Sequence, residues 1–90
     1  MIYRIEFRPS AEQGLAKLDP YIRRKVSAGI DKLAVNPRPF GVEKLKGSGG
    51  LYRVYAGPGK DYRVIYEIKD AILLILVVKV GDRKDVYRSL

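Results

Sequence analysis

The sequence predicts a single α+β domain over residues 1–90, with the order β-α-α-β-β-β. We expect a hairpin of two helices packed on a four-stranded, mostly antiparallel sheet, followed by a short C-terminal helix. Three observations predict this class: an alternating apolar segment at the N-terminus, two segments with apolar residues at helical spacing, and three apolar segments in the C-terminal half. Ninety residues suit one small domain.

Pro9 separates the first strand from the first helix. Residues 1–7 alternate between apolar and polar side chains, which is typical of a strand with one buried face. Ser10 and Gln13 have the spacing of a capping box, in which the two side chains satisfy backbone N–H groups at the start of a helix. The first helix should therefore begin just after the proline.

The second helix has clear signals at both ends. Asp19 is a favourable N-cap, and Pro20 suits the first helical position because the N–H that it lacks would have no partner there. Apolar residues recur at three- and four-residue intervals over residues 22–33, which predicts one buried face. Asn36-Pro37 is expected to end this helix.

Three strands are expected in the C-terminal half. Residues 51–56 and 62–68 alternate, and the Gly57-Pro58-Gly59 segment between them predicts a hairpin. Residues 72–80 are almost all apolar, which indicates a central strand covered on both faces. The polar residues 82–90 have weak helical character.

The connection over residues 38–50 contains four glycines and carries Lys44 and Lys46. Its Lys-Gly-Ser-Gly-Gly segment superficially suggests a phosphate-binding loop. A Walker loop, however, ends in Gly-Lys-Ser/Thr and leads into a helix, and neither feature is present here. We therefore expect a flexible loop before a strand and no nucleotide site.

The composition restricts the chemistry. The chain has no cysteine and no histidine, which excludes disulfides, thiol nucleophiles and histidine as a base or metal ligand. The acidic residues are scattered, and the close pair Asp82 and Asp85 is flanked by cations, so we expect no metal and no cofactor. Any catalysis must use Arg, Lys, Tyr, Asp, Glu or backbone amides.

The charge favours a polyanionic partner. Eighteen Lys and Arg residues against ten Asp and Glu residues give a net charge of +8. Nucleic acid, an acidic protein or an anionic membrane surface would suit this excess, and a basic domain without such a partner is the alternative. Residues 71–78, the longest apolar run, are too few to span a membrane, and the charged N-terminus does not fit a signal peptide, so the cytoplasm is expected.

Cations and tyrosines interleave in the C-terminal half, as single-stranded RNA binding would require. Lysine and arginine can contact phosphates, and tyrosine rings can stack on bases. Strand alternation puts Arg53 and Tyr55 on one face, and a helical tail would put Arg83 and Tyr87 one turn apart. The alternative is a solvated basic face with tyrosines at the edge of the core. The series comprises Lys44, Lys46, Arg53, Lys60, Arg63, Arg83 and Lys84, with Tyr52, Tyr55, Tyr62 and Tyr87.

These residue types are also sufficient for cleaving RNA. The 2′-hydroxyl is the nucleophile, so an enzyme has to accept its proton, stabilise charge on the phosphate and assist the leaving 5′-oxygen. Arginine and lysine can stabilise the phosphate. Nearby cations also favour the phenolate form of a tyrosine, which could then act as the base. A ribonuclease without histidine is therefore feasible.

Four segments are more specific than the composition. They are Lys-Leu-Lys-Gly at residues 44–47, Leu-Tyr-Arg-Val at 51–54, Asp-Tyr-Arg-Val-Ile-Tyr at 61–66 and Val-Gly-Asp-Arg-Lys-Asp-Val-Tyr at 80–87. With the order of elements, they resemble RelE toxins of the RelE/ParE superfamily of toxin–antitoxin systems, over essentially the whole chain. The resemblance implies an endoribonuclease that cuts messenger RNA in the ribosomal A site, leaving a 2′,3′-cyclic phosphate and a 5′-hydroxyl.

The resemblance also implies a role for each site residue. Arg53 and Arg63 would hold and stabilise the phosphate. Arg83 would stabilise it and assist the leaving group, while Tyr87 would be the general base. RNA contacts are implied for Lys44, Lys46, Tyr55 and Lys84.

Two positions depart from the pattern of the best-known members. Tyr55 stands where they have a second lysine, so either the site has one cation fewer and a lower rate, or this ring stacks on a base instead. Asp82 stands where many relatives have histidine or lysine, and an acid there would weaken the neighbouring Arg83 as a leaving-group acid.

The same resemblance implies a partner. A small RelB-like antitoxin would wrap the basic domain, block the site and form a heteromeric complex, and an acidic extended segment could pair with an exposed sheet edge. The alternative within the superfamily is a ParE-like inhibitor of DNA gyrase without nuclease activity, because the fold would be the same. A tyrosine base among three arginines favours the ribonuclease, since a gyrase inhibitor has no need of it.

Overall fold

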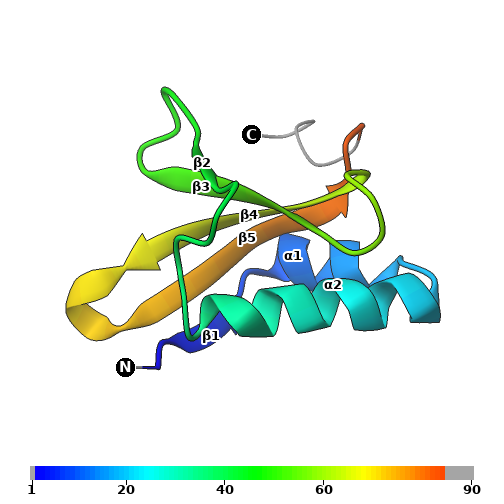
Figure 1. The fold of residues 1–90 in the computed structure, drawn as a ribbon, viewed down its shortest axis with the longest axis horizontal. Helices are drawn as coiled ribbons and strands as arrows, with labels where there is room; N and C mark the ends of the chain where they lie inside the picture. Colours follow the sequence, from blue (N-terminus) through cyan, green and yellow to red (C-terminus); the bar gives the residue numbers. More distant parts are fainter. Residues whose placement is uncertain (1, 85–90) are drawn as a thin grey trace.

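A computed structural model describes residues 2–84 of the chain (Figure 1). The elements are β1 (Arg4–Phe7), α1 (Pro9–Ala16), α2 (Pro20–Leu33), β2 (Glu43–Lys44), β3 (Leu51–Ala56), β4 (Tyr62–Lys69), the 3₁₀ turn η1 (Asp70–Ile72) and β5 (Leu74–Asp82). One sheet contains the strands in the order β1-β5-β4-β3-β2. β1 runs parallel to β5, and the other pairs are antiparallel. The predicted α+β class and helical hairpin are confirmed.

The sheet has one strand more than the four expected. β2 consists of two residues within the predicted connection 38–50, where Glu43 pairs with Arg53 and Lys44 with Tyr52. Two residues are too few to show the alternation by which a strand is recognised in a sequence. The expected C-terminal helix falls on residues 85–90 and lies outside the described residues.

Both helices cover the same face of the sheet, as Figure 1 shows, and the core lies between them and the strands. Alternate residues of β4 and β5 point into it, among them Tyr66 and Val77, and α2 contributes Ile30, all almost completely buried. The segment expected as a central strand is indeed central, because β5 lies between β1 and β4. On its other face, Leu76 and Lys79 are only half-buried.

The start of α1 differs from the expectation. Its N-cap is Arg8, which makes no side-chain cap bond, and Pro9 occupies the first turn, so the predicted capping box is wrong. Ser10 Oγ instead donates to the carbonyl oxygen of Val78 at 2.7 Å and ties the helix to β5. The two elements approach so closely that a Cβ on Gly14 would lie 2.0 Å from the carbonyl oxygen of Val80. Only glycine fits at this crossing.

The start of α2 matches the prediction. The carboxylate of Asp19 accepts a hydrogen bond from the backbone N–H of Tyr21 at 3.0 Å, and Pro20 occupies the first helical turn. The helix ends at Leu33, slightly before the Asn36-Pro37 stop.

An exposed polar cluster joins three parts of the chain. Arg38 binds the carboxylate of Asp70 with 2.9 Å between Nη2 and Oδ2, and the Tyr3 hydroxyl donates to the same carboxylate at 2.6 Å. The hydrogen bonds from Arg38 and then Tyr3 lower the pKa of Asp70 to about 2. Nearby, the hydroxyl of Tyr66 donates to the carbonyl oxygen of Pro37 at 2.7 Å. The segment that leads from α2 to β2 is therefore anchored to the sheet.

Candidate nucleic-acid interface

The helix-free face of the sheet brings Arg53 and Arg63 together. Arg53 of β3 lies opposite Ile65 of β4, and Arg63 of β4 lies opposite Tyr55 of β3. Side chains alternate along a strand, and Val64 between Arg63 and Ile65 belongs to the core. The other four side chains therefore share the face away from the helices, as the alternation of Arg53 and Tyr55 predicted.

Tyr55 is the centre of this group. The guanidinium carbon of Arg53 lies 4.8 Å from the centre of its ring, that of Arg63 lies 4.9 Å away, and the ammonium nitrogen of Lys60 lies 5.8 Å away. Each cation is attracted to the electron-rich ring. We call Arg53, Tyr55, Lys60 and Arg63 the cationic face. The aromatic ring offsets part of the repulsion that three neighbouring positive charges would otherwise experience.

The two arginines are partly withdrawn from water. The Nε atom of Arg53 and the Nε and Nη1 atoms of Arg63 are buried, and the Arg53 side chain as a whole is 16% exposed. Charges in such surroundings interact with an anion more strongly than charges in water. Glu43 accepts a hydrogen bond from Nη2 of Arg53, and its own side chain is 63% exposed. An incoming phosphate would have to share or replace this carboxylate.

Glu43 was not singled out from the sequence. Its place in the site depends on β2, the two-residue strand that puts it opposite Arg53. A single acid in a glycine-rich segment carries no local signal of that pairing.

The predicted residues of the tail are only partly described. Arg83 is exposed, and its backbone N–H donates to the carbonyl oxygen of Asp61 at 2.9 Å, which holds it near the start of β4. Lys84 is also exposed, and its N–H donates to the carboxylate of Asp82 at 2.9 Å. Tyr87 lies outside the described residues.

The structure does not bring Lys44 onto the cationic face. It lies opposite Tyr52, on the side of the sheet that faces the helices, with its Nζ atom 5.9 Å from the centre of that ring. Lys46 is exposed in the loop between β2 and β3. Ser48 closes this loop, because its Oγ donates to the carbonyl oxygen of Leu45 at 2.6 Å and accepts from the N–H of Leu51 at 3.0 Å.

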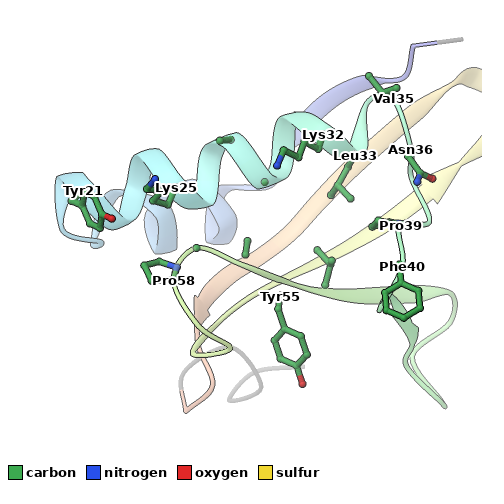
Figure 2. A pocket seen from close by; sticks show the side chains of 15 residues that line it. Tyr21, Lys25, Lys32, Leu33, Val35, Asn36, Pro39, Phe40, Tyr55 and Pro58 are labelled. Carbon is green, nitrogen blue, oxygen red and sulfur yellow. The ribbon is translucent and has the colours of Figure 1, made fainter.

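A groove between α2 and β3 is a second surface feature (Figure 2). We call it the α2–β3 groove. It is lined by residues from α2, from residues 35–40 and from β3 and the turn after it, and none of the lining residues is acidic. Lys25 and Lys32 border it on α2, and the lining residues Tyr21 and Phe40 are strongly exposed. The ring of Tyr55 points away from α2 in this view. The sequence alone did not predict the groove, because its walls are far apart in the chain.

The edge of β3 is open along part of this groove. Within the described residues, β2 pairs only with Tyr52 and Arg53, so residues 54–56 have no strand beside them on that side. An open edge of this kind presents backbone N–H and C=O groups to an incoming extended segment.

Two further observations concern the described part of the chain, residues 2–84. No group of three or more Asp, Glu, His or Cys side chains is arranged there to hold a metal ion. None of the helices there is long and apolar enough to cross a membrane.

Comparison with known proteins places these features in a family. The family model for the ParE toxin of the type II toxin–antitoxin system parDE matches residues 5–87. A RelE-like toxin protein of Escherichia coli is 33% identical over 89 residues, which covers 97% of this chain and 92% of that protein. Toxin RelE1 of Methanocaldococcus jannaschii is 29% identical over 92 residues, covering 99% of each chain. A chain of the archaeal RelE–RelB complex from Pyrococcus horikoshii has a TM-score of 0.74 at 33% identity, covering 94% of this chain and 99% of that chain.

Proposed function

Because this chain belongs to the RelE/ParE superfamily of type II toxins, we propose that it cleaves messenger RNA in the A site of the small ribosomal subunit and so inhibits translation. The observation that carries this proposal is the cationic face. Arg53 and Arg63 lie around one tyrosine ring on the side of the sheet that no helix covers in the described residues. Two partly buried guanidinium groups suit a phosphate and its developing negative charge.

The proposed reaction uses the RNA's own nucleophile. The 2′-oxygen forms a bond to the adjacent phosphorus as its proton passes to a base. The bond between phosphorus and the 5′-oxygen then breaks, and that oxygen takes up a proton. The products are a 2′,3′-cyclic phosphate and a 5′-hydroxyl. Arg53 and Arg63 stabilise the extra negative charge on the phosphate oxygens in the transition state.

The remaining roles in this proposal follow the resemblance to RelE toxins. Tyr87 accepts the proton of the 2′-hydroxyl, and Arg83 assists the departing 5′-oxygen. Lys44, Lys46 and Lys84 contact the RNA backbone away from the reacting phosphate. All three lysines are exposed, which supports this assignment because contacts to RNA phosphates need solvent-accessible cations.

Primer extension on messenger RNA bound to stalled ribosomes tests the proposal. We expect cuts within the A-site codon when the protein and ribosomes are both present, and no cuts in a control without ribosomes. Lys44→Ala combined with Lys46→Ala should weaken ribosome binding and reduce its salt dependence. Absence of cuts in every sample would overturn the proposal.

Inhibition of DNA gyrase is the second candidate, and one observation favours it: the family model that matches residues 5–87 describes a ParE toxin. The shared fold does not separate the two activities. A supercoiling assay with purified gyrase does, since a gyrase inhibitor blocks supercoiling and leaves ribosome-bound RNA intact. The cationic face leads us to expect unchanged supercoiling.

We also propose that an antitoxin segment occupies the α2–β3 groove. The structural relative from Pyrococcus horikoshii is solved as a complex of RelE with RelB. In this chain the groove offers exposed apolar side chains, the open edge of β3 and two lysines without a lining acid. These features suit an extended acidic segment with apolar anchors, which can pair with the edge and place carboxylates near Lys25 and Lys32.

Co-expression with a RelB-like antitoxin tests the partner proposal. We expect a complex that lacks cleavage activity, and a weaker complex for the double variant Lys25→Glu and Lys32→Glu. The matched control is Lys17→Glu with Lys69→Glu, which makes the same charge change at residues outside the groove. Equal weakening by both pairs would overturn the assignment to this groove.

A further inference from the structure

Lys79 is a cation on the helix-free face that the sequence did not single out. It lies on β5 opposite Ile65 of β4, and Ile65 lies opposite Arg53 of β3. Its neighbour Val80 belongs to the core, so Lys79 points to the other side of the sheet. One row across three strands therefore contains Arg53, Ile65 and Lys79.

A β-bulge is what puts Lys79 on this face. The register between β4 and β5 shifts between Ile65 and Tyr66, so that Tyr66 pairs with Val77 while Ile65 pairs with Lys79. Val77 faces the core, and strict alternation along β5 would direct Lys79 toward the core as well. The extra residue, Val78, reverses the alternation. Bulges are often found where a strand re-aims a side chain at a functional site.

Three positively charged positions surround Ile65. Arg53 and Lys79 flank it on the neighbouring strands, and Arg63 lies two residues before it on the same strand and face. Adjacent strands are about 4.8 Å apart, so Arg53 and Lys79 start roughly 10 Å from each other. Side chains of this length can bring both charged ends over the residue between them. Gly81, opposite Arg63, adds no side chain to the space beside it.

The burial of Ile65 fits this arrangement. It is fully buried although it lies on the face away from the helices and outside the main core cluster. Lysine and arginine commonly lay their aliphatic stems along an apolar surface and keep the charge in water. An apolar floor with cations on three sides is suited to a single phosphate group, since each wall can donate to a different oxygen.

We propose that Lys79 binds the same RNA phosphate as Arg53 and Arg63, from the β5 side of the site. This assignment rests on the proposed RNA-directed function. Lys79 would bind phosphate in both the bound substrate and the transition state, because its charge faces the phosphate oxygens throughout. Its loss should therefore weaken RNA binding as well as cleavage.

Lys79→Gln tests the assignment, with Lys69→Gln as the matched control. Lys69 lies on the same face of the sheet, but opposite Leu74 at the far end of β4. Its replacement by glutamine removes one positive charge, as Lys79→Gln does. Binding is measured by fluorescence anisotropy with a single-stranded RNA whose 2′-hydroxyls are methylated, so that it cannot be cleaved. Cleavage is measured on stalled ribosomes.

For Lys79→Gln we expect about three- to tenfold weaker RNA binding and a salt-dependence slope smaller by about 0.7, the value for one lost phosphate contact on a single strand. Cleavage should fall at least as much, the melting temperature should stay the same, and Lys79→Arg should restore most of the loss. Lys69→Gln should have the RNA binding, salt dependence and cleavage of the native protein. If Lys79→Gln behaves like Lys69→Gln, Lys79 is not in the site.

The two readouts separate this assignment from the proposed function. If the native protein binds the methylated RNA and cuts no message on ribosomes, the ribonuclease proposal fails and Lys79 is judged by binding alone. If it cleaves and Lys79→Gln cleaves and binds equally well, only the Lys79 assignment fails. If the native protein neither binds the methylated RNA nor cuts message on ribosomes, both are overturned, and if it only cleaves, Lys79 is judged by cleavage alone.

Discussion

The two faces of the sheet are built from the same strands but differ in what they carry. Along β4, Val64 and Tyr66 are fully buried against the helices, whereas Arg63 on the other face is half-buried beside Tyr55. One face excludes water and so stabilises the fold. The other concentrates positive charge next to an aromatic ring. Neighbouring residues of one strand can therefore be changed to test stability and function separately.

The largest expected effect is on the helix-covered face. Ile75→Ala removes a fully buried side chain from the core and should lower the free energy of unfolding by about 2–5 kcal/mol. That is a large part of the stability of a small domain. Urea unfolding followed by circular dichroism measures it. A loss below about 1 kcal/mol would show that the core can close around the cavity.

The matching change on the open face is Arg63→Ala. Cleavage should fall by about 100-fold or more, because a charged donor to the transition state is lost. The melting temperature should change little, since Arg63 lies outside the core cluster. Single-turnover cleavage on stalled ribosomes measures the cleavage rate, and a thermal melt measures the melting temperature. Full activity of this variant would contradict the assignment of Arg63 to the phosphate site.

A smaller effect is expected for Tyr66→Phe. The change keeps the ring in the core and deletes the hydroxyl that donates to the carbonyl oxygen of Pro37. Burial raises the pKa of Tyr66, so the hydroxyl remains a donor well into alkaline solution. We expect a loss of about 1 kcal/mol in urea unfolding. Cleavage should be unchanged, and a loss of activity would contradict the separation of the two faces.

The smallest effect is expected at Asp70, at the exposed edge. Hydrogen bonds from Arg38 and Tyr3 lower its pKa to about 2 in the folded protein, below the ordinary value of 3.8. A carboxyl group whose pKa is lowered by folding stabilises the folded state at pH values above its ordinary pKa. This contribution disappears as the pH falls toward 2. Asp70→Asn should therefore lower the melting temperature slightly at pH 7, and the difference should close between about pH 4 and pH 2. A difference independent of pH would contradict the ion pair as its cause.

Much of the fold could be predicted because its signals are local. Asp19 and Pro20 mark the start of α2, the Gly57-Pro58-Gly59 turn marks the hairpin, and alternation puts Arg53 beside Tyr55 on one face. The start of α1 was misjudged because Ser10 binds a carbonyl of β5, a partner 68 residues away. No spacing within the helix records that contact.

The candidate site was predicted only in part for the same reason. Arg53 and Arg63 were singled out, and the structure brings them to one ring. Lys44 was grouped with them, but its register opposite Tyr52 puts it on the other face. Glu43 was missed, because only its pairing with Arg53 reveals it.

The sequence by itself determined which segments form the two helices and the four longer strands, because propensity, caps and apolar periodicity act over a few residues. It also determined that the chemistry excludes histidine and cysteine. Tertiary structure alone decided which charges meet. Three features show this: the parallel pairing of β1 with β5, the short strand β2, and the bulge that turns Lys79 to the helix-free face. All three depend on which strands pair and in what register. A shift of one residue in register moves a side chain to the opposite face, and register is set by contacts across the whole sheet.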